Sequence, residues 1–139
     1  MKKINAIYIY KKKINNLKIK NLIKNLKKIN IDISRYCFHK KNSKNEQLML
    51  ILRKRNSYKI IEKTNDMMFI YMIRGKMKVS EIKKNRVNKS YIIKTGMISI
   101  VQKNQYFSNE IISKDAMYFE FCNKPPTVLK RLNKRKINN

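Results

Sequence analysis

Few side chains in this sequence are able to act as an acid, a base, a nucleophile or a metal ligand. His39 is the single histidine, and aspartate and glutamate together number eight in 139 residues. A Ser-His-Asp arrangement would have to use His39, and no G-x-S-x-G turn is present to expose its serine. The two glycines of the chain also exclude a glycine-rich loop that cradles a phosphate. Serine-hydrolase and P-loop chemistry are therefore not predicted.

The cysteines, Cys37 and Cys122, are two in number. They lie far apart in the sequence, and neither belongs to a C-x-x-C or paired Cys/His spacing, so a structural zinc site is not expected. One disulfide is possible on paper, but in a reducing compartment two distant cysteines are more often free and buried. We expect free, buried cysteines here.

Three carboxylates lie near each other in the sequence, at Glu110, Asp115 and Glu120. Glu120 is flanked by Phe119 and Phe121 on a segment with strand alternation, so its side chain faces away from theirs. Two orientations remain open for it. Glu120 either points inward, where burial would raise its pKa, or points outward to pair with a lysine.

The net charge of +27 comes from 35 lysines and arginines against eight acids. Such an excess would attract nucleic acid or another anionic surface. The chain is also rich in isoleucine and asparagine, which like lysine have A/T-rich codons, so an AT-rich genome would give the same basic protein without any function for the charge. The even spread of the lysines favours this compositional interpretation.

The C-terminal tail is the exception to that even spread. Residues 127–139 hold a basic cluster, and we expect this tail to be mobile. No RNA-binding signature accompanies it. The best candidates for contacts to the phosphates of nucleic acid are Lys130, Arg131, Lys134, Arg135 and Lys136.

Two kinds of apolar pattern divide the chain. In residues 14–29 apolar side chains recur at steps of three and four, which predicts an amphipathic helix of about four turns. A basic amphipathic helix can bind a membrane surface, but packing against the rest of the domain is the favoured interpretation. From residue 34 onward the period changes to the alternation of strands.

Short segments rich in isoleucine, valine, tyrosine, phenylalanine and methionine alternate with polar turns. They are residues 47–53, 58–61, 67–73, 77–82, 91–93, 97–101, 106–112 and 116–121. Their spacing is typical of a mainly β fold, a small antiparallel β-barrel or jelly roll. Pro125-Pro126 is expected to end it, since proline cannot join a ladder. The expected parts are an N-terminal segment with one helix at 1–33, the barrel at 34–126 and the basic tail at 127–139.

The chain shows no membrane span and no export signal. Its longest apolar run, Met67 to Ile73, is far too short to cross a bilayer. The N-terminus begins with lysines and an apolar patch, as a signal peptide would. That patch is short, is interrupted by Asn5 and lacks a small-residue cleavage site. A cytoplasmic protein is expected.

Gly75 and Gly96, the two glycines, have a spacing that resembles two motifs of the cupins. The first motif reads G-x5-H-x-H-x3-4-E-x6-G and the second reads G-x5-P-x-G-x2-H-x3-N. Gly75 fits the closing glycine of the first, and Gly96 fits the opening glycine of the second. Three flanking segments are similar to successive strands of the WbuC-type subfamily, namely RYCFH at 35–39, QLMLIL at 47–52 and SY at 57–58.

Downstream, Phe119-Glu120-Phe121 and Pro125 fall where the WbuC-type cupins have F-E-x and a G-P pair. Over residues 34–126 the chain therefore resembles the RmlC-like cupin superfamily. The resemblance implies a cupin-like barrel. In the family, three histidines and a glutamate project inward and hold one divalent metal ion. The resemblance also implies a setting in surface-polysaccharide metabolism.

Other residues occupy the family's metal-ligand positions in this chain. The motifs put Glu62 and Thr64 at the H-x-H pair, Met68 at the glutamate and Phe107 at the third histidine. None of the four ligands is retained, so no cofactor is expected. A rebuilt site would join Glu62 to donors on other strands. The candidates there are His39, Cys37 and Glu110 as donors, with Arg35 and Glu120 as further residues of the cavity.

Three functions remain open at this point. The first is a WbuC-type protein that has lost its metal centre and acts as a small-ligand-binding or structural protein, without a catalytic residue. The second is a metal-dependent enzyme that acts on a sugar through a rebuilt site. The third is a basic protein associated with nucleic acid. A homodimer is expected by analogy with other cupins.

Overall fold

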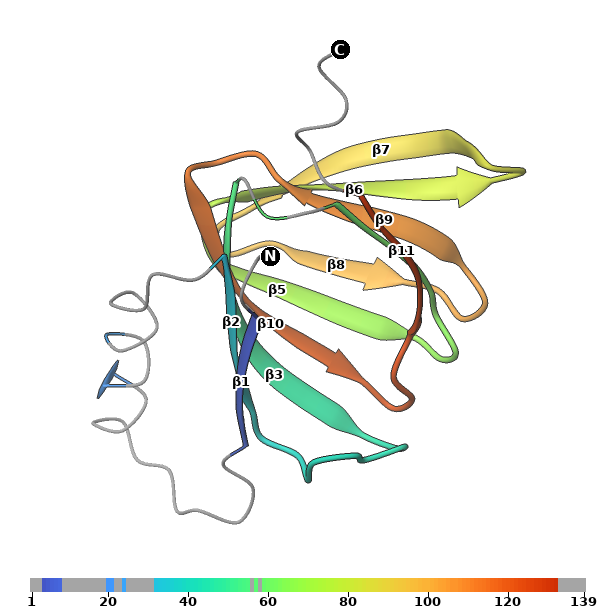
Figure 1. The fold of residues 1–139 in the computed structure, drawn as a ribbon. Helices are drawn as coiled ribbons and strands as arrows, with labels where there is room; N and C mark the ends of the chain where they lie inside the picture. The colour runs from blue at the N-terminus through green and yellow to red at the C-terminus, as the bar shows by residue number, and fades with distance from the viewer. Residues whose placement is uncertain are drawn as a thin grey trace.

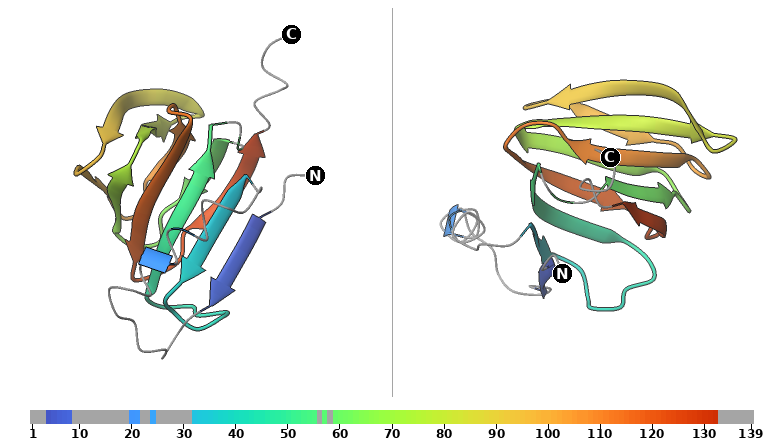
Figure 2. Two further views of the ribbon diagram at one scale, coloured as in Figure 1. Left: turned by 90° about the vertical axis from the view of Figure 1, so that its left-hand side faces the viewer. Right: turned by 45° about the horizontal axis from the view of Figure 1, so that its top comes forward.

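The computed structural model describes residues 4–8, 20–21, 24, 32–55, 57 and 59–132, which form two β-sheets packed face to face (Figures 1 and 2). The six-stranded sheet has the order β1 (Ile4–Tyr8), β2 (Ile33–Cys37), β3 (Gln47–Lys54), β10 (Asp115–Cys122), β5 (Met68–Arg74) and β8 (Ile98–Val101). The five-stranded sheet has the order β11 (Thr127–Leu132), β4 (Lys59–Lys63), β9 (Tyr106–Ile111), β6 (Lys76–Lys83) and β7 (Arg86–Lys94). Neighbouring strands are antiparallel, except that β1 runs parallel to β2.

The mainly β prediction is confirmed, and each of the eight segments expected between residues 47 and 121 contains a strand. The closed barrel is wrong for the described part of the chain. Strands there pair only within their own sheet, so each sheet keeps two edge strands and the layers meet through side chains. The helix expected at 14–29 lies outside the described residues, apart from Lys20, Asn21 and Lys24, whose side chains are exposed.

Two strands extend the fold beyond the expected boundaries. β1 adds an edge strand beside β2, in the N-terminal segment 1–33, where a helix was predicted and no strand. β11 pairs with β4, so residues 127–132 belong to a sheet and not to a tail, while residues 133–139 lie outside the described part. Pro125 and Pro126 occupy the connection between β10 and β11, where a missing N–H interrupts no ladder.

The core lies between the two sheets and follows from strand alternation. Along β5 the side chains of Met68, Ile70 and Met72 are fully buried and face the interior, where Met77 and Val79 of β6 join the same cluster. Successive side chains of a strand point to opposite faces. Alternation therefore fixes which polar residues enter this interior.

No helix in the described part has the length and apolar character needed to cross a membrane.

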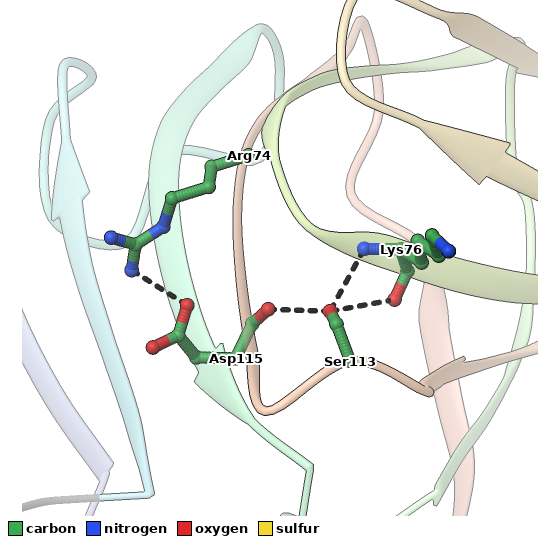
Figure 3. A network of polar contacts seen from close by, with 4 residues as sticks. All are labelled: Arg74, Lys76, Ser113 and Asp115. Atoms are coloured by element: carbon green, nitrogen blue, oxygen red, sulfur yellow. Dashed lines mark hydrogen bonds and ion pairs between the residues drawn. The ribbon is translucent and has the colours of Figure 1, made fainter.

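The corner between β5 and β6, where the chain passes from one sheet to the other, is held by a compact polar network (Figure 3). Ser113 Oγ accepts a hydrogen bond from the Lys76 backbone N–H at 2.8 Å and donates to the Asp115 carbonyl at 2.5 Å. Arg74 forms an ion pair with the Asp115 carboxylate at 2.6 Å. Gly75 sits inside the corner with φ of +92°, a conformation that favours glycine.

Replacing Gly75 by alanine should destabilise the protein more than the same change at Gly96. A Cβ at Gly75 would overlap the Asp115 carbonyl oxygen and lie 2.8 Å from Ser113 Oγ, whereas a Cβ at Gly96 would meet nothing within 4 Å. Both glycines have positive φ. Gly96→Ala should therefore cost about 1–2 kcal/mol of unfolding free energy, and Gly75→Ala should add about 1–3 kcal/mol for the overlap. Urea unfolding measures both, and equal losses would contradict this account.

Candidate functional site

The four residues that the motifs match to metal ligands lie in or beside the core. Three of them are buried between the sheets, and the fourth, Thr64, holds a turn. Glu62 on β4 and Phe107 on β9 are cross-strand partners, and both side chains are buried between the sheets. Met68 is fully buried in the same core. The Thr64 hydroxyl accepts a hydrogen bond from the Gln105 backbone N–H at 2.9 Å and donates to the Gln102 carbonyl. Thr64 therefore ties down the turn that precedes β9.

The most polar part of the interior is formed by Arg35, Arg53, Glu62, Tyr118 and Glu120, which we call the interior polar cluster. Arg35 comes from β2, Arg53 from β3, Glu62 from β4, and the other two from β10. Electrostatic coupling links them, because Arg53, Glu120 and Glu62 all act on the ionisation of Tyr118, and Arg35 and Arg53 both act on Glu120. Strands from both sheets thus bring two cations, two acids and a phenol together.

Arg53 is the centre of this cluster, and it was not among the residues predicted from the sequence. Its side chain is 1% exposed. Its guanidinium donates hydrogen bonds to Asn109 Oδ1 on β9, to Ser57 Oγ at 3.3 Å, and to Tyr118 on β10. An arginine buried so fully must have its donors met by acceptors. The one available signal was alternation, since Arg53 continues the inward series Met49, Ile51.

Burial dominates the ionisation of the two β10 residues. Desolvation raises the pKa of Tyr118 to about 12, with Arg53 acting in the opposite direction. Desolvation also raises the pKa of Glu120, against the pull of Arg35 and Arg53. The cross-strand neighbours of Glu120 are Met49 and Ile70, whose apolar side chains do not solvate its carboxyl group. Of the two orientations considered for Glu120, the structure has the inward one.

The remaining candidates on β2 and just after it lie at the margin of the interior. Cys37 is buried, and desolvation raises its pKa while Arg35 and a hydrogen bond with Tyr8 lower it. His39 is buried, with Nδ1 3.2 Å from the Leu48 carbonyl and the Tyr8 ring against it edge-on at 5.9 Å. Burial lowers the pKa of His39, so its neutral form is favoured. His39 also lines an open groove of about 430 Å³ beside Phe38.

A second open groove, of about 510 Å³, lies where the turn of the β6–β7 hairpin meets the turn before β9. Tyr106 lines it and is 44% exposed. Lys83 and Lys84 line it as well, and the Lys63 ammonium lies 5.7 Å from the centre of the Tyr106 ring. This arrangement combines an exposed aromatic face with positive charge. It was not foreseen from the sequence.

The donors present do not fit the divalent metal ion that the sequence resemblance implies. Of the four positions that the motifs match to metal ligands, only the one at Glu62 carries a carboxylate. The Thr64 hydroxyl is already hydrogen-bonded to the backbone of Gln102 and Gln105. Among the described residues no group of three or more His, Cys, Asp or Glu is gathered where it could hold a metal. His39 sits at the margin of the interior, on a backbone carbonyl, and Arg53 places a positive charge in the cluster itself.

The other candidates fall outside the interior or outside what is described. Cys37 and Cys122 are both free and buried, as expected, and desolvation raises the pKa of Cys122 to about 12. Lys130 and Arg131 lie on β11, and nothing is described of their side chains. The last three basic candidates, Lys134, Arg135 and Lys136, lie outside the described residues.

Replacing Arg53 by methionine should destabilise the fold strongly. The change leaves the Asn109 amide oxygen and the Tyr118 hydroxyl without their donor. It also removes one of the two cations that act on the buried Glu120. We expect a loss of about 3–5 kcal/mol of unfolding free energy, measured by urea denaturation. Arg55→Met is the matched control, because Arg55 is exposed, and it should change stability by no more than about 0.5 kcal/mol. Equal effects would show that Arg53 does not hold the interior together.

No family model matches this chain, and no curated protein matches it either. Solved structures do. An RmlC-like cupin protein from Ralstonia eutropha JMP134 is similar with a TM-score of 0.57 and 11% identity, over 71% of this chain and 60% of that protein. The Cnp3 cupin domain from Schizosaccharomyces pombe is similar with a TM-score of 0.55 and 16% identity, over 71% of this chain and 67% of that domain.

The DMSP lyase DddQ from Ruegeria pomeroyi DSS-3 is similar with a TM-score of 0.56 and 8% identity, over 70% of this chain and 51% of that protein. The chain thus spans about half to two thirds of the length of these three proteins. One of them is named as a lyase and another as a domain of Cnp3. One fold can host many functions, so the likeness does not assign one. At these identities the likeness concerns the fold alone. The chain has the fold of the RmlC-like cupins.

Proposed function

We propose that this chain is a divergent WbuC-type cupin-fold protein that works without a metal centre, as a small-ligand-binding or structural protein. One observation carries the proposal. The four positions that would hold the metal are taken by a core methionine, a core phenylalanine, a threonine committed to a turn and a single glutamate. The WbuC-type motif residues of β2, β3 and β10 support the subfamily.

The electrostatics of the interior support the same conclusion. Arg53 is enclosed beside Tyr118, and Arg35 acts on Glu120 from β2, two strands away in the same sheet. A divalent cation added to this cluster would be repelled by both guanidinium groups, and the low polarity of the interior would strengthen that repulsion. The cluster is suited to hydrogen bonding and ion pairing, not to metal coordination.

The ligand class that suits this interior is a small molecule with a carboxylate or another anionic group. A guanidinium presents a planar fork of donors that matches such groups. Arg35 Nε is buried and has no hydrogen-bond partner. An anionic acceptor would satisfy this donor, whereas a cation or a purely apolar ligand would not.

The available nucleophiles and bases favour binding over catalysis. The pKa of Cys37 and that of Cys122 are both raised by burial, which keeps each thiol in its unreactive form. His39 contacts the Leu48 carbonyl through Nδ1 and has no described carboxylate partner to orient it as a general base. A metal-dependent enzyme with a rebuilt site would instead need His39 and Glu62 at one centre.

Elemental analysis of the purified full-length chain tests the proposal directly. We expect substoichiometric metal, unchanged by Glu62→Gln, because a single carboxylate beside arginines holds a divalent ion poorly. Glu46→Gln, at an exposed carboxylate, is the matched control. One Fe, Mn, Ni or Zn per chain that is lost in Glu62→Gln and kept in Glu46→Gln would overturn the proposal and favour the metal-dependent enzyme.

A second candidate function, binding of single-stranded nucleic acid, is favoured by the Tyr106 groove. Bases stack on exposed aromatic rings, and neighbouring lysines attract the phosphates. Tyr106 offers such a ring, with Lys63 beside it and Lys83 and Lys84 along the same groove. Part of this charge is internally balanced, because Lys83 also pairs with Glu81 at 3.1 Å.

Binding of a fluorescent single-stranded oligonucleotide tests this candidate. Affinity should fall by about 10³ or more between roughly 50 and 200 mM salt if about six phosphates are contacted. Tyr106→Ala should cost a further 1–3 kcal/mol or so from lost stacking, while Tyr106→Phe, which keeps the ring, should bind as the wild type does. Binding that is absent at low salt, or equal for both variants, would remove the Tyr106 groove as the site.

A further inference from the structure

The loop between β2 and β3 (Figure 1) borders the open groove of about 430 Å³ that His39 lines, which we call the His39 groove. Its walls are apolar and are formed by Phe38, Leu48 and Phe121, of which the last two are each 37% exposed. A groove of this volume can hold a small organic molecule. It shares no lining residue with the Tyr106 groove.

The loop beside the His39 groove is held by its own hydrogen bonds. The Ser43 backbone N–H donates to the Lys40 carbonyl at 3.1 Å, and the Gln47 side-chain amide donates to the Ser43 carbonyl at 3.0 Å. Asn42 takes the left-handed backbone conformation with φ of +64°, which asparagine adopts more readily than most residues. The loop is therefore already ordered, and little loss of chain entropy opposes the binding of a ligand.

The contact between His39 and the backbone assigns the hydrogen on the imidazole ring. Nδ1 lies 3.2 Å from the Leu48 carbonyl oxygen. A carbonyl oxygen only accepts hydrogen bonds, so Nδ1 is the nitrogen that donates. In the neutral ring the other nitrogen, Nε2, is then an acceptor. Burial lowers the pKa of His39 and so favours this neutral form.

The acceptor Nε2 is left for a ligand. Among the residues that the structure describes, none donates a hydrogen bond to it. The Tyr8 ring lies against the imidazole edge-on at 5.9 Å, and the Tyr8 hydroxyl is hydrogen-bonded to Cys37 instead. His39 is 9% exposed, so water reaches it poorly. An acceptor that is poorly hydrated gains more from a donor on a ligand than an exposed acceptor does.

The charges that line the His39 groove are of opposite sign. They belong to Lys40 and Glu46, and both residues are exposed. Exposed charges are hydrated and screened by salt, so each attracts an ion only weakly. The groove therefore lacks the strong positive bias of a chain with a net charge of +27. A neutral ligand suits it better than an anion does.

We propose that the His39 groove binds a neutral, apolar molecule that carries a hydroxyl group, such as a phenol. The apolar part of the ligand lies against Phe38, Leu48 and Phe121, and an aromatic ring gains from contact with the two phenylalanines. The hydroxyl group donates a hydrogen bond to His39 Nε2. This site is separate from the interior polar cluster, whose arginines suit an anionic ligand.

Titration of the full-length chain with para-fluorophenol and with para-fluoroanisole, followed by fluorine NMR, tests the proposal. The two probes share a fluorinated ring, but the anisole has a methyl group on its oxygen and cannot donate a hydrogen bond. We expect the phenol to bind about three- to tenfold more tightly, which is the range of one hydrogen bond. Equal affinities, or no binding of either probe at millimolar concentration, would overturn the proposal in the wild-type chain alone.

Two replacements of His39 separate the acceptor from the contact with the backbone. His39→Asn places an amide nitrogen near the position of Nδ1, so it keeps the bond to the Leu48 carbonyl and removes the acceptor. This variant should bind the two probes equally. His39→Gln can place an amide oxygen near the position of Nε2, and it should keep part of the preference for the phenol. A full preference for the phenol in His39→Asn would show that Nε2 is not the acceptor.

The charged residues of the groove are tested in the same titration. Glu46→Gln should still prefer the phenol, because a hydrogen bond to an exposed carboxylate only replaces one to water. A preference lost in Glu46→Gln and kept in His39→Asn would make Glu46 the acceptor. We also expect para-fluorobenzoate to bind no more tightly than para-fluorophenol. Tighter binding of the benzoate would mean that the groove selects anions through Lys40, and the proposal would fail.

A pair of apolar replacements locates the probes on the protein. Leu48→Ala shortens one wall of the groove but keeps the backbone carbonyl that His39 contacts, and it should weaken the binding of both probes. Val87→Ala is the matched control, since Val87 is also exposed but lies on β7 of the other sheet, and it should change neither affinity. Probes that are insensitive to Leu48→Ala, or equally sensitive to both changes, bind elsewhere and contradict the proposal.

Discussion

A guanidinium enclosed between two sheets sets the strongest constraint on this fold. Arg53 has left water almost completely, and a buried cation is tolerated only where acceptors surround it. Those acceptors come from separate parts of the chain, because Ser57 follows β3, Asn109 lies on β9 and Tyr118 lies on β10. The bond to Asn109 joins the six-stranded sheet to the five-stranded one, so it adds a directional constraint to the close packing between the two layers.

This arrangement changes what the interior can do. Arg35 and Arg53 place positive charge beside the acids Glu62 and Glu120, where a divalent cation would meet electrostatic repulsion. The neighbouring groups adjust to burial, since desolvation moves both Tyr118 and Glu120 towards their neutral forms. What remains is a set of donors and acceptors that can hold a small polar molecule or simply hold the sheets.

Sequence patterns predicted the strands between residues 47 and 121 because alternation there is strong and the turns are polar. They missed β1, whose five residues lie among lysines and become a strand through pairing with β2. They also missed β11, because Pro125-Pro126 marked a connection and not an end. The orientation of Glu120 could not be decided from the sequence, and Arg53 was not predicted to be buried, for the same reason. A charged residue on a strand can face the core only if the fold supplies partners for it, and those partners come from distant parts of the sequence.

The β7 edge of the five-stranded sheet gives the surplus of lysine a consequence of another kind. Among the described strands none pairs with the outer side of β7, and eight of its nine residues are exposed, Arg86, Lys89 and Lys94 among them. An open strand edge is a template on which further chains can add, and positive charge along it makes that growth unfavourable. Codon bias alone could have put those lysines there. They would still act as gatekeepers that keep the protein from polymerising through its own sheet.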